Sequence, residues 1–235
     1  AKIEITLRQG TGTPVPAIKS IDRTQDLPLS FAQERLWFID QFQPNSIAYN
    51  IPGAVRIKGY INVSAMQSSL NDLIERHESL RTIFINQEGS AFQRVQAFKP
   101  IQIKQIQQPD NVDIAKDLIQ RAKAEASLPF DLSVGPLLRV QLVQIDTEDH
   151  ALFITMHHIV SDGWSMTLFI KEMAMLYDAY CKGHQPQLAP LPIQYGDYAF
   201  WQREWLQGDV LDQQLSYWKQ ELCEVGNLNL PTDRP

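Results

Sequence analysis

The spacing of hydrophobic and polar residues divides the chain into predicted helices and strands. Residues 64–78 form the clearest predicted helix, because apolar side chains recur there at i, i+3 and i+4 spacing along one stripe. The stripe consists of Val63, Met66, Leu70, Leu73 and Ile74. Ser30 and Gln33 match a capping box, which predicts a helix start at residue 31. Helices are also predicted at residues 31–39, 112–127, 166–182, 193–206 and 210–224.

Strands are predicted where polar and apolar residues alternate, or where a short apolar run lies between turn residues. They cover residues 49–61, 80–86, 92–96, 101–106, 137–145 and 151–156. The last of these is apolar throughout, so both of its faces are expected to be covered. Strands mixed with covering helices predict an α/β layered fold.

The first residues have a different composition. Residues 9–26 contain glycines, prolines and scattered charges and are typical of a linker. We therefore predict an interdomain linker over residues 1–26 and one folded unit over residues 27–235. The missing initiator methionine and the ending Pro-Thr-Asp-Arg-Pro suggest a piece of a longer polypeptide.

The composition limits the classes of partner that we expect. Of 235 residues, 44% are hydrophobic and 20% charged, as in a soluble globular protein. The net charge is −6 and no cluster of lysine and arginine occurs, so nucleic acid is not an expected partner. The chain begins with no signal peptide and has no apolar run near the roughly 20 residues that span a membrane, so we expect a cytoplasmic protein without a membrane partner. Cys181 and Cys223 are expected to be free thiols, packed on helices.

The candidate chemistry follows the apolar strand 151–156. His157 and His158 come directly after it, and Asp162 and Gly163 follow. A neutral imidazole can take a proton from an attacking amine or alcohol, and a nearby aspartate can fix the imidazole tautomer or the loop geometry. The glycine would allow close approach of a substrate or a positive φ. A structural role for a strand-end histidine is the competing interpretation, which the tandem His-His with Asp-Gly makes weaker.

Other kinds of site find little support. Two histidines without a third histidine or cysteine at useful spacing do not predict a metal site. Gly-x-Ser-x-Gly, Walker and Gly-x-Gly-x-x-Gly motifs are missing from the sequence, so a serine hydrolase or a bound nucleotide is not expected.

The segment His-His-Ile-Val-Ser-Asp-Gly-Trp-Ser at residues 157–165 resembles the HHxxxDG motif of nonribosomal peptide synthetase condensation domains. Residues 28–38, 76–84 and 195–201 resemble the first, second and fourth core motifs of that family, in the same order. The resemblance runs over residues 27–235 and corresponds to the amino-terminal lobe of a two-lobe domain. It implies a chloramphenicol acetyltransferase-like lobe, with a mixed β-sheet covered by helices.

The resemblance also implies a reaction, an amide-forming acyl transfer. His158 matches the catalytic histidine, and the α-amine of a downstream aminoacyl thioester would attack an upstream thioester, both held on phosphopantetheine arms. No cofactor would bind directly. The implied partners are upstream and downstream peptidyl carrier domains, the carboxy-terminal lobe of the same domain and an adenylation domain. The motifs favour an L-configured donor and an L-configured acceptor.

Other residues receive supporting roles from the resemblance. His157 and Asp162 would be structural, with Asp162 paired to an arginine. Arg76, Arg81 and Arg35 would be structural ion-pair anchors. Gly163, Trp164 and Ser165 would line the substrate tunnel. The aromatic group of residues 195–205 is interpreted as core packing because of its helical spacing.

Three hypotheses of function stay open at this point. The parent domain could form amides, or the same fold could form esters with a hydroxyl nucleophile. The isolated lobe could also be a non-catalytic, carrier-docking half, and we expect it to be inactive alone because the family's tunnel lies between two lobes. Whether His158 takes the proton or orients the amine is left undecided by the sequence.

Overall fold

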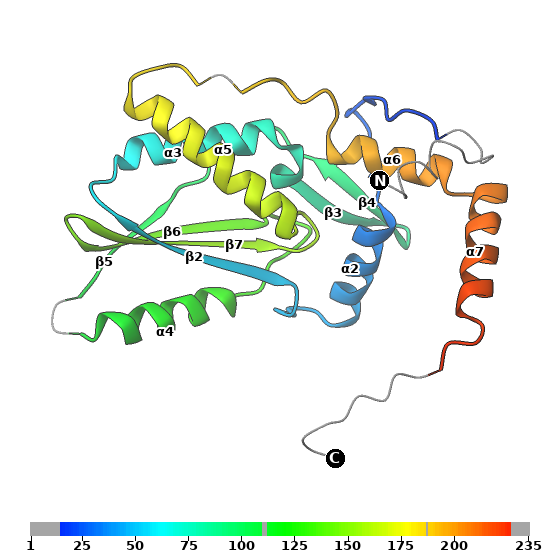
Figure 1. Cartoon of the computed structure of the whole chain (residues 1–235), viewed down its shortest axis with the longest axis horizontal. Coiled ribbons are helices and arrows are strands. Elements are labelled where there is room, and N and C mark those ends of the chain that lie inside the picture. Colours follow the sequence, from blue (N-terminus) through cyan, green and yellow to red (C-terminus); the bar gives the residue numbers. More distant parts are fainter. Residues whose placement is uncertain (1–14, 110–111, 187, 227–235) are drawn as a thin grey trace, which may run out of the picture.

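Seven strands form two sheets within residues 15–109, 112–186 and 188–226, the part of the chain that this computed structural model describes (Figure 1). The smaller sheet has the order β1 (Leu27–Pro28), β4 (Ser90–Val95) and β3 (Thr82–Gln87). The larger has the order β2 (Asn50–Lys58), β7 (Asp149–His157), β6 (Leu138–Asp146) and β5 (Lys104–Gln107). β5 is parallel to β6 and the other pairs of the larger sheet are antiparallel, so that sheet is mixed, as expected.

Helices cover both faces of the larger sheet. α3 and α5 lie on one face and α4 lies on the other (Figure 1). α2 and α6 lie near the smaller sheet, and α7 extends beyond them (Figure 1). The bounds are α2 Phe31–Phe42, α3 Val63–Arg76, η1 Glu78–Arg81 (a 3-10 turn), α4 Ile114–Ala126, α5 Gly163–Cys181, α6 Tyr195–Trp205 and α7 Gly208–Leu222.

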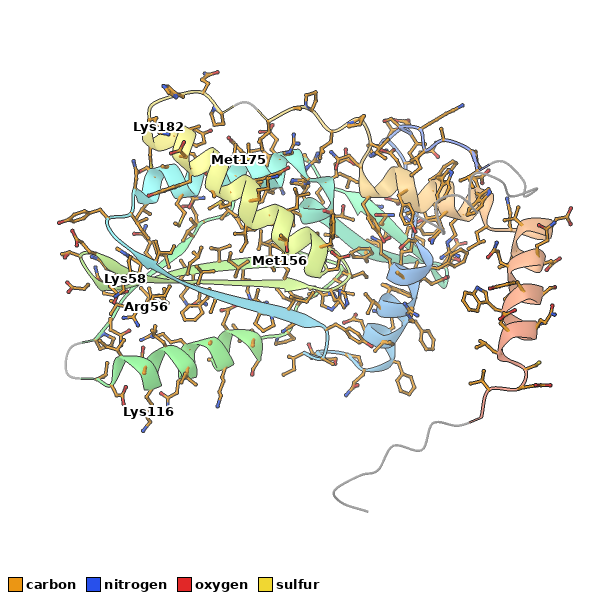
Figure 2. The ribbon with its side chains drawn as sticks, in the orientation of Figure 1. Arg56, Lys58, Lys116, Met156, Met175 and Lys182 are labelled. Atoms are coloured by element: carbon orange, nitrogen blue, oxygen red, sulfur yellow. The ribbon has the colours of Figure 1, made fainter. Side chains whose placement is uncertain are left out.

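The main core lies between the larger sheet and the pair α3 and α5. The stripe predicted on α3 is confirmed, because Leu70 and Leu73 are fully buried there and their stripe neighbours pack in the same cluster. Met156 of β7 lies in this core, between α5 and the sheet (Figure 2). Phe153 of the same strand packs toward α4 instead. β7 is therefore covered on both faces, as its apolar sequence predicted.

Several predicted boundaries move because of contacts that are distant in sequence. The strand predicted from residue 101 begins only at Lys104, since Asn71 and Gln67 of α3 accept the amides of Ile101 and Ile103 at 3.2 and 2.9 Å. The helix predicted at 64–78 ends at Arg76, and the 3-10 turn η1 separates it from β3.

The cysteines also differ from expectation. Cys181 ends α5 and Cys223 follows α7, and both are exposed free thiols, so the prediction that they are packed was wrong. No helix in the described ranges is both long enough and apolar enough to cross a bilayer.

The described part of the predicted linker, residues 15–26, lies along α6. Trp201 donates its indole N–H to the carbonyl of Pro16 at 2.7 Å. Arg23 contacts the buried Asp197 at 2.7 Å, and the amide of Ile21 donates to the same carboxylate at 2.9 Å. The boundary at residue 26 stays a prediction, and residues 1–14 lie outside the described part.

Candidate active site

The motif connects β7 to α5. β7 ends at His157, and α5 begins at Gly163, so Asp162 is the residue before the helix. Its carboxylate accepts the amide of Ser165 at 2.8 Å, and its own amide donates to the Ser165 hydroxyl at 2.7 Å. This reciprocal capping box closes the turn. The helix therefore starts three residues before the predicted residue 166.

His157 is built into the core beneath this turn. Its side chain is 3% exposed, and its Nδ1 accepts the amide of Ile159 at 3.1 Å. The ring meets the Phe130 ring edge-on, with centroids 6.2 Å apart. Burial, with a smaller contribution from the neighbouring His158, lowers the pKa of His157 to about 4. A neutral, buried ring with an engaged Nδ1 fits a structural role better than proton transfer.

His158 points the other way and is exposed in this chain. Its amide donates to the carbonyl of Tyr49 on the segment before β2, at 2.8 Å. Its Nδ1 lies 2.7 Å from the carbonyl oxygen of Ser161. A carbonyl can only accept, so Nδ1 carries the hydrogen and Nε2 of the neutral ring keeps a lone pair. The turn thus presets the tautomer in which Nε2 can accept a proton or orient an amine.

His158 opens into a cavity of about 550 Å³. The walls come from α2, from the turn after β7 and from the first residues of α5 and α6, and they include Arg35, Trp164, Ser165 and Tyr195. Gly163 lies between two lining residues, with open space where a Cβ would stand. It adopts no positive φ, so that alternative for the glycine was wrong.

The predicted arginines separate into two groups. Arg76 and Arg81 are half-buried, and each lies near a glutamate: Arg76 is 3.3 Å from Glu172, and Arg81 is 3.9 Å from Glu78. Arg35 makes no ion pair within the described residues and faces the cavity instead. Its position differs from that of an ion-pair anchor.

Asp162 also lacks an arginine partner in the described part of the chain. Its carboxylate is used as a helix cap, and the amide of Ser165 holds its pKa below the ordinary value. The Asp162 carboxylate can still bind a cation while it caps the helix, because a carboxylate has several acceptor positions. Within the same ranges, no cluster of three or more potential metal ligands occurs.

Sequence reasoning missed Tyr195. The aromatic residues of α6 were interpreted as core, but Tyr195 is 40% exposed and lines the cavity beside His158. Tyr198, Trp201 and Trp205 follow it along the helix and are only half-buried. Neighbouring rings of this series have centroids 5.1 to 5.8 Å apart, and only the Trp201 and Trp205 rings are stacked. No local pattern in the sequence distinguishes Tyr195 from Tyr198. The position of Tyr195 depends on how α6 packs against α2.

Comparison with known proteins gives a consistent result. A family model described as "Condensation domain" matches residues 23–235. The chain is 48% identical over 237 residues to one of the linear gramicidin synthase proteins of Brevibacillus parabrevis, a match that covers 100% of this chain and 3% of that protein. It is 37% identical over 228 residues to a dimodular nonribosomal peptide synthase of Bacillus subtilis (strain 168), covering 93% of this chain and 9% of the relative.

Solved structures agree in fold. The complex of the X-domain and OxyB from teicoplanin biosynthesis matches with a TM-score of 0.83 and 28% identity, over 95% of this chain and 49% of that one. The starter condensation domain of the rhizomide synthetase RzmA matches with a TM-score of 0.78 and 22% identity, over 86% of this chain and 49% of that one, which is a likeness of fold. The chain spans about half the length of these structures and less than a tenth of the two synthases.

Proposed function

Because the chain belongs to the condensation-domain family, we propose that it is the amino-terminal half of a domain that joins two carrier-bound thioesters through a peptide bond. The predicted family and its α/β fold of the chloramphenicol acetyltransferase-like type are confirmed by the family match and by the solved structures. The reaction, the substrates and the partners of the whole protein are part of the proposal.

The observation that carries the proposal is the state of His158. Nδ1 is occupied by the Ser161 carbonyl at 2.7 Å, and the ring borders the cavity. The free Nε2 can accept a proton from an α-amine as the new C–N bond forms, and it can return that proton to the departing thiolate as the C–S bond breaks. The products are an amide and a thiol, and no directly bound cofactor is needed.

The other site residues take supporting roles in this proposal. His157 is structural, and Asp162 holds the turn and remains able to meet an arginine from the other half of the domain. Gly163, Trp164 and Ser165 border the path of the substrates. Arg35 faces the same cavity, so we assign it to substrate contact instead of ion-pair anchoring.

The proposed partners are an upstream and a downstream peptidyl carrier domain, whose phosphopantetheine arms deliver the substrates. The carboxy-terminal lobe of the same domain would supply the facing wall, and an adenylation domain would load the carriers. The names of the synthases that this chain resembles support such a setting. The L-donor and L-acceptor preference and a cytosolic location stay predictions.

The test compares this chain alone with the complete domain that contains it, each mixed with an aminoacyl-loaded donor carrier and an aminoacyl-loaded acceptor carrier. Mass spectrometry of the acceptor carrier measures the dipeptide. We expect product with the complete domain and only background with the chain alone. Background levels in both samples would contradict the condensation function, and equal product in both would contradict the need for a second half.

A further inference from the structure

Tyr195 lines the cavity, but it has no role in the proposed reaction as described above. It is the first residue of α6, so its position is set by the helix start and not by a loop. It lines the same cavity as His158 and Arg35. Its phenol adds a hydroxyl to a wall that also contains the imidazole of His158, the guanidinium of Arg35 and a second tyrosine, Tyr49.

The hydrogen bond between Tyr195 and Ser30 sets the direction of the phenol proton. Ser30 is fully buried, and within the described residues its Oγ has two partners, the amide of Gln33 at 3.2 Å and the Tyr195 hydroxyl at 3.0 Å. The amide can only donate to Oγ. The buried serine proton therefore has Tyr195 as its acceptor, since a buried donor without a partner is strongly disfavoured.

Tyr195 thus receives a hydrogen bond from Ser30 and keeps its own proton for the cavity. Partial burial raises the pKa of Tyr195 above its ordinary value; the hydrogen bond from Ser30 opposes this rise, and the charge of the neighbouring Asp162 adds to it. The phenol consequently stays protonated at neutral pH. It can donate a hydrogen bond there, and it is unsuited to act as a base.

We propose that Tyr195 donates a hydrogen bond to a carbonyl oxygen of the thioester-tethered substrate in the His158 cavity. The inference rests on the proposed function, which fills this cavity with acyl thioesters on amide-containing arms. The acceptor would be either the thioester carbonyl or an amide carbonyl of the arm, which share the same chemistry. His158 would act on the amine while Tyr195 holds an oxygen.

The experiment removes only the hydroxyl, in the complete domain with loaded carriers. Tyr195→Phe is compared with Tyr198→Phe, a matched change one turn along α6, where the hydroxyl accepts from Gln202 at 3.0 Å. We expect about a tenfold loss of kcat/KM in Tyr195→Phe, the size of one lost hydrogen bond, and less than about a twofold change in Tyr198→Phe. A fall in kcat would place the acceptor at the thioester carbonyl, and a rise in KM would place it on the arm. Equal effects in both variants, or none in either, would overturn the proposal.

A binding measurement separates this inference from the proposed function. The probe is an acyl-pantetheine amide with a ¹³C-labelled acyl carbonyl, titrated into the complete domain and followed by NMR. We expect weaker binding to Tyr195→Phe than to wild type and to Tyr198→Phe, even if wild type makes no dipeptide. That result would keep Tyr195 as a donor while the condensation function fails. Equal binding to all three proteins, or no binding to wild type, would reject the donor role.

Discussion

The carbonyl oxygen of Ser161 lies 2.7 Å from Nδ1 of His158 and fixes which nitrogen of that ring faces the cavity. The orienting group belongs to the backbone of the turn, so no side-chain substitution at Ser161 removes it directly. A carboxylate orients the ring of many histidines, whereas a neutral backbone carbonyl orients the ring of His158. The geometry of the turn therefore determines which tautomer of the neutral ring is present.

His158→Ala should abolish most dipeptide formation in the complete domain, by at least about a hundredfold, because the proton acceptor is lost. Its melting temperature should match that of wild type, since the side chain is exposed in this chain. His184→Ala is the control, because His184 is also exposed and lies outside the cavity. A product yield within twofold of wild type in His158→Ala would remove His158 from the reaction.

His157 should make stability depend on pH. Its pKa is about 4 in the fold against an ordinary value of 6.5, so the unfolded chain binds more protons between these values. The contribution of the neutral ring is complete above pH 6.5, declines as the pH falls and is lost below pH 4. The free energy of unfolding, measured with urea, should fall between about pH 7 and about pH 5 in wild type. In His157→Asn this fall should be smaller by roughly 2 kcal/mol. Parallel losses in the two proteins would contradict a buried neutral His157.

Asp162→Ala should lower the free energy of unfolding by about 1 kcal/mol, the usual cost of a lost helix cap. Activity should fall as well, because the turn that orients His158 is closed by this cap. Asp113→Ala removes a comparable cap from α4, where Asp113 accepts the amide of Lys116 at 3.1 Å, and should cost stability without activity. Equal activity losses in the two variants would show that the effect of Asp162 is not local.

Asp197→Asn should release residues 16–26 from α6. The carboxylate is buried and accepts from Arg23 and from the amide of Ile21, so its loss should cost roughly 2 kcal/mol. Trypsin should then cleave after Arg23 at least about tenfold faster, because protection follows the local opening equilibrium. Asp178→Asn breaks an exposed pair with Lys182 and should change neither quantity measurably. Unchanged cleavage in Asp197→Asn would show that these residues are held by other contacts.

The sequence predicted those features that local patterns determine. The stripe on α3 and the covered strand β7 follow from periodicity, and the position of His158 at a strand end follows from the apolar run before it. The capping box at Ser30 and Gln33 was also predictable, because both of its bonds lie within four residues.

The errors have a common physical origin in contacts between distant segments. β5 starts late because two side chains of α3, 30 and 36 residues earlier, accept hydrogen bonds from the amides before it. Tyr195 was assigned to the core, but its hydrogen bond with Ser30, 165 residues away in sequence, holds it at the cavity. Asp162 is a separate, local case: the sequence did not predict that its carboxylate caps α5, and the structural role expected for it stays a prediction.

Within the described residues, α7 has no fully buried side chain, and Tyr217 and Trp218 are each more than half exposed. A helix of 15 residues that buries so little of its surface is only marginally stable in water. Its amide hydrogens should therefore exchange with solvent orders of magnitude faster than those of α3, which is held by the main core. Slowing of that exchange would report directly when another part of the protein covers this helix.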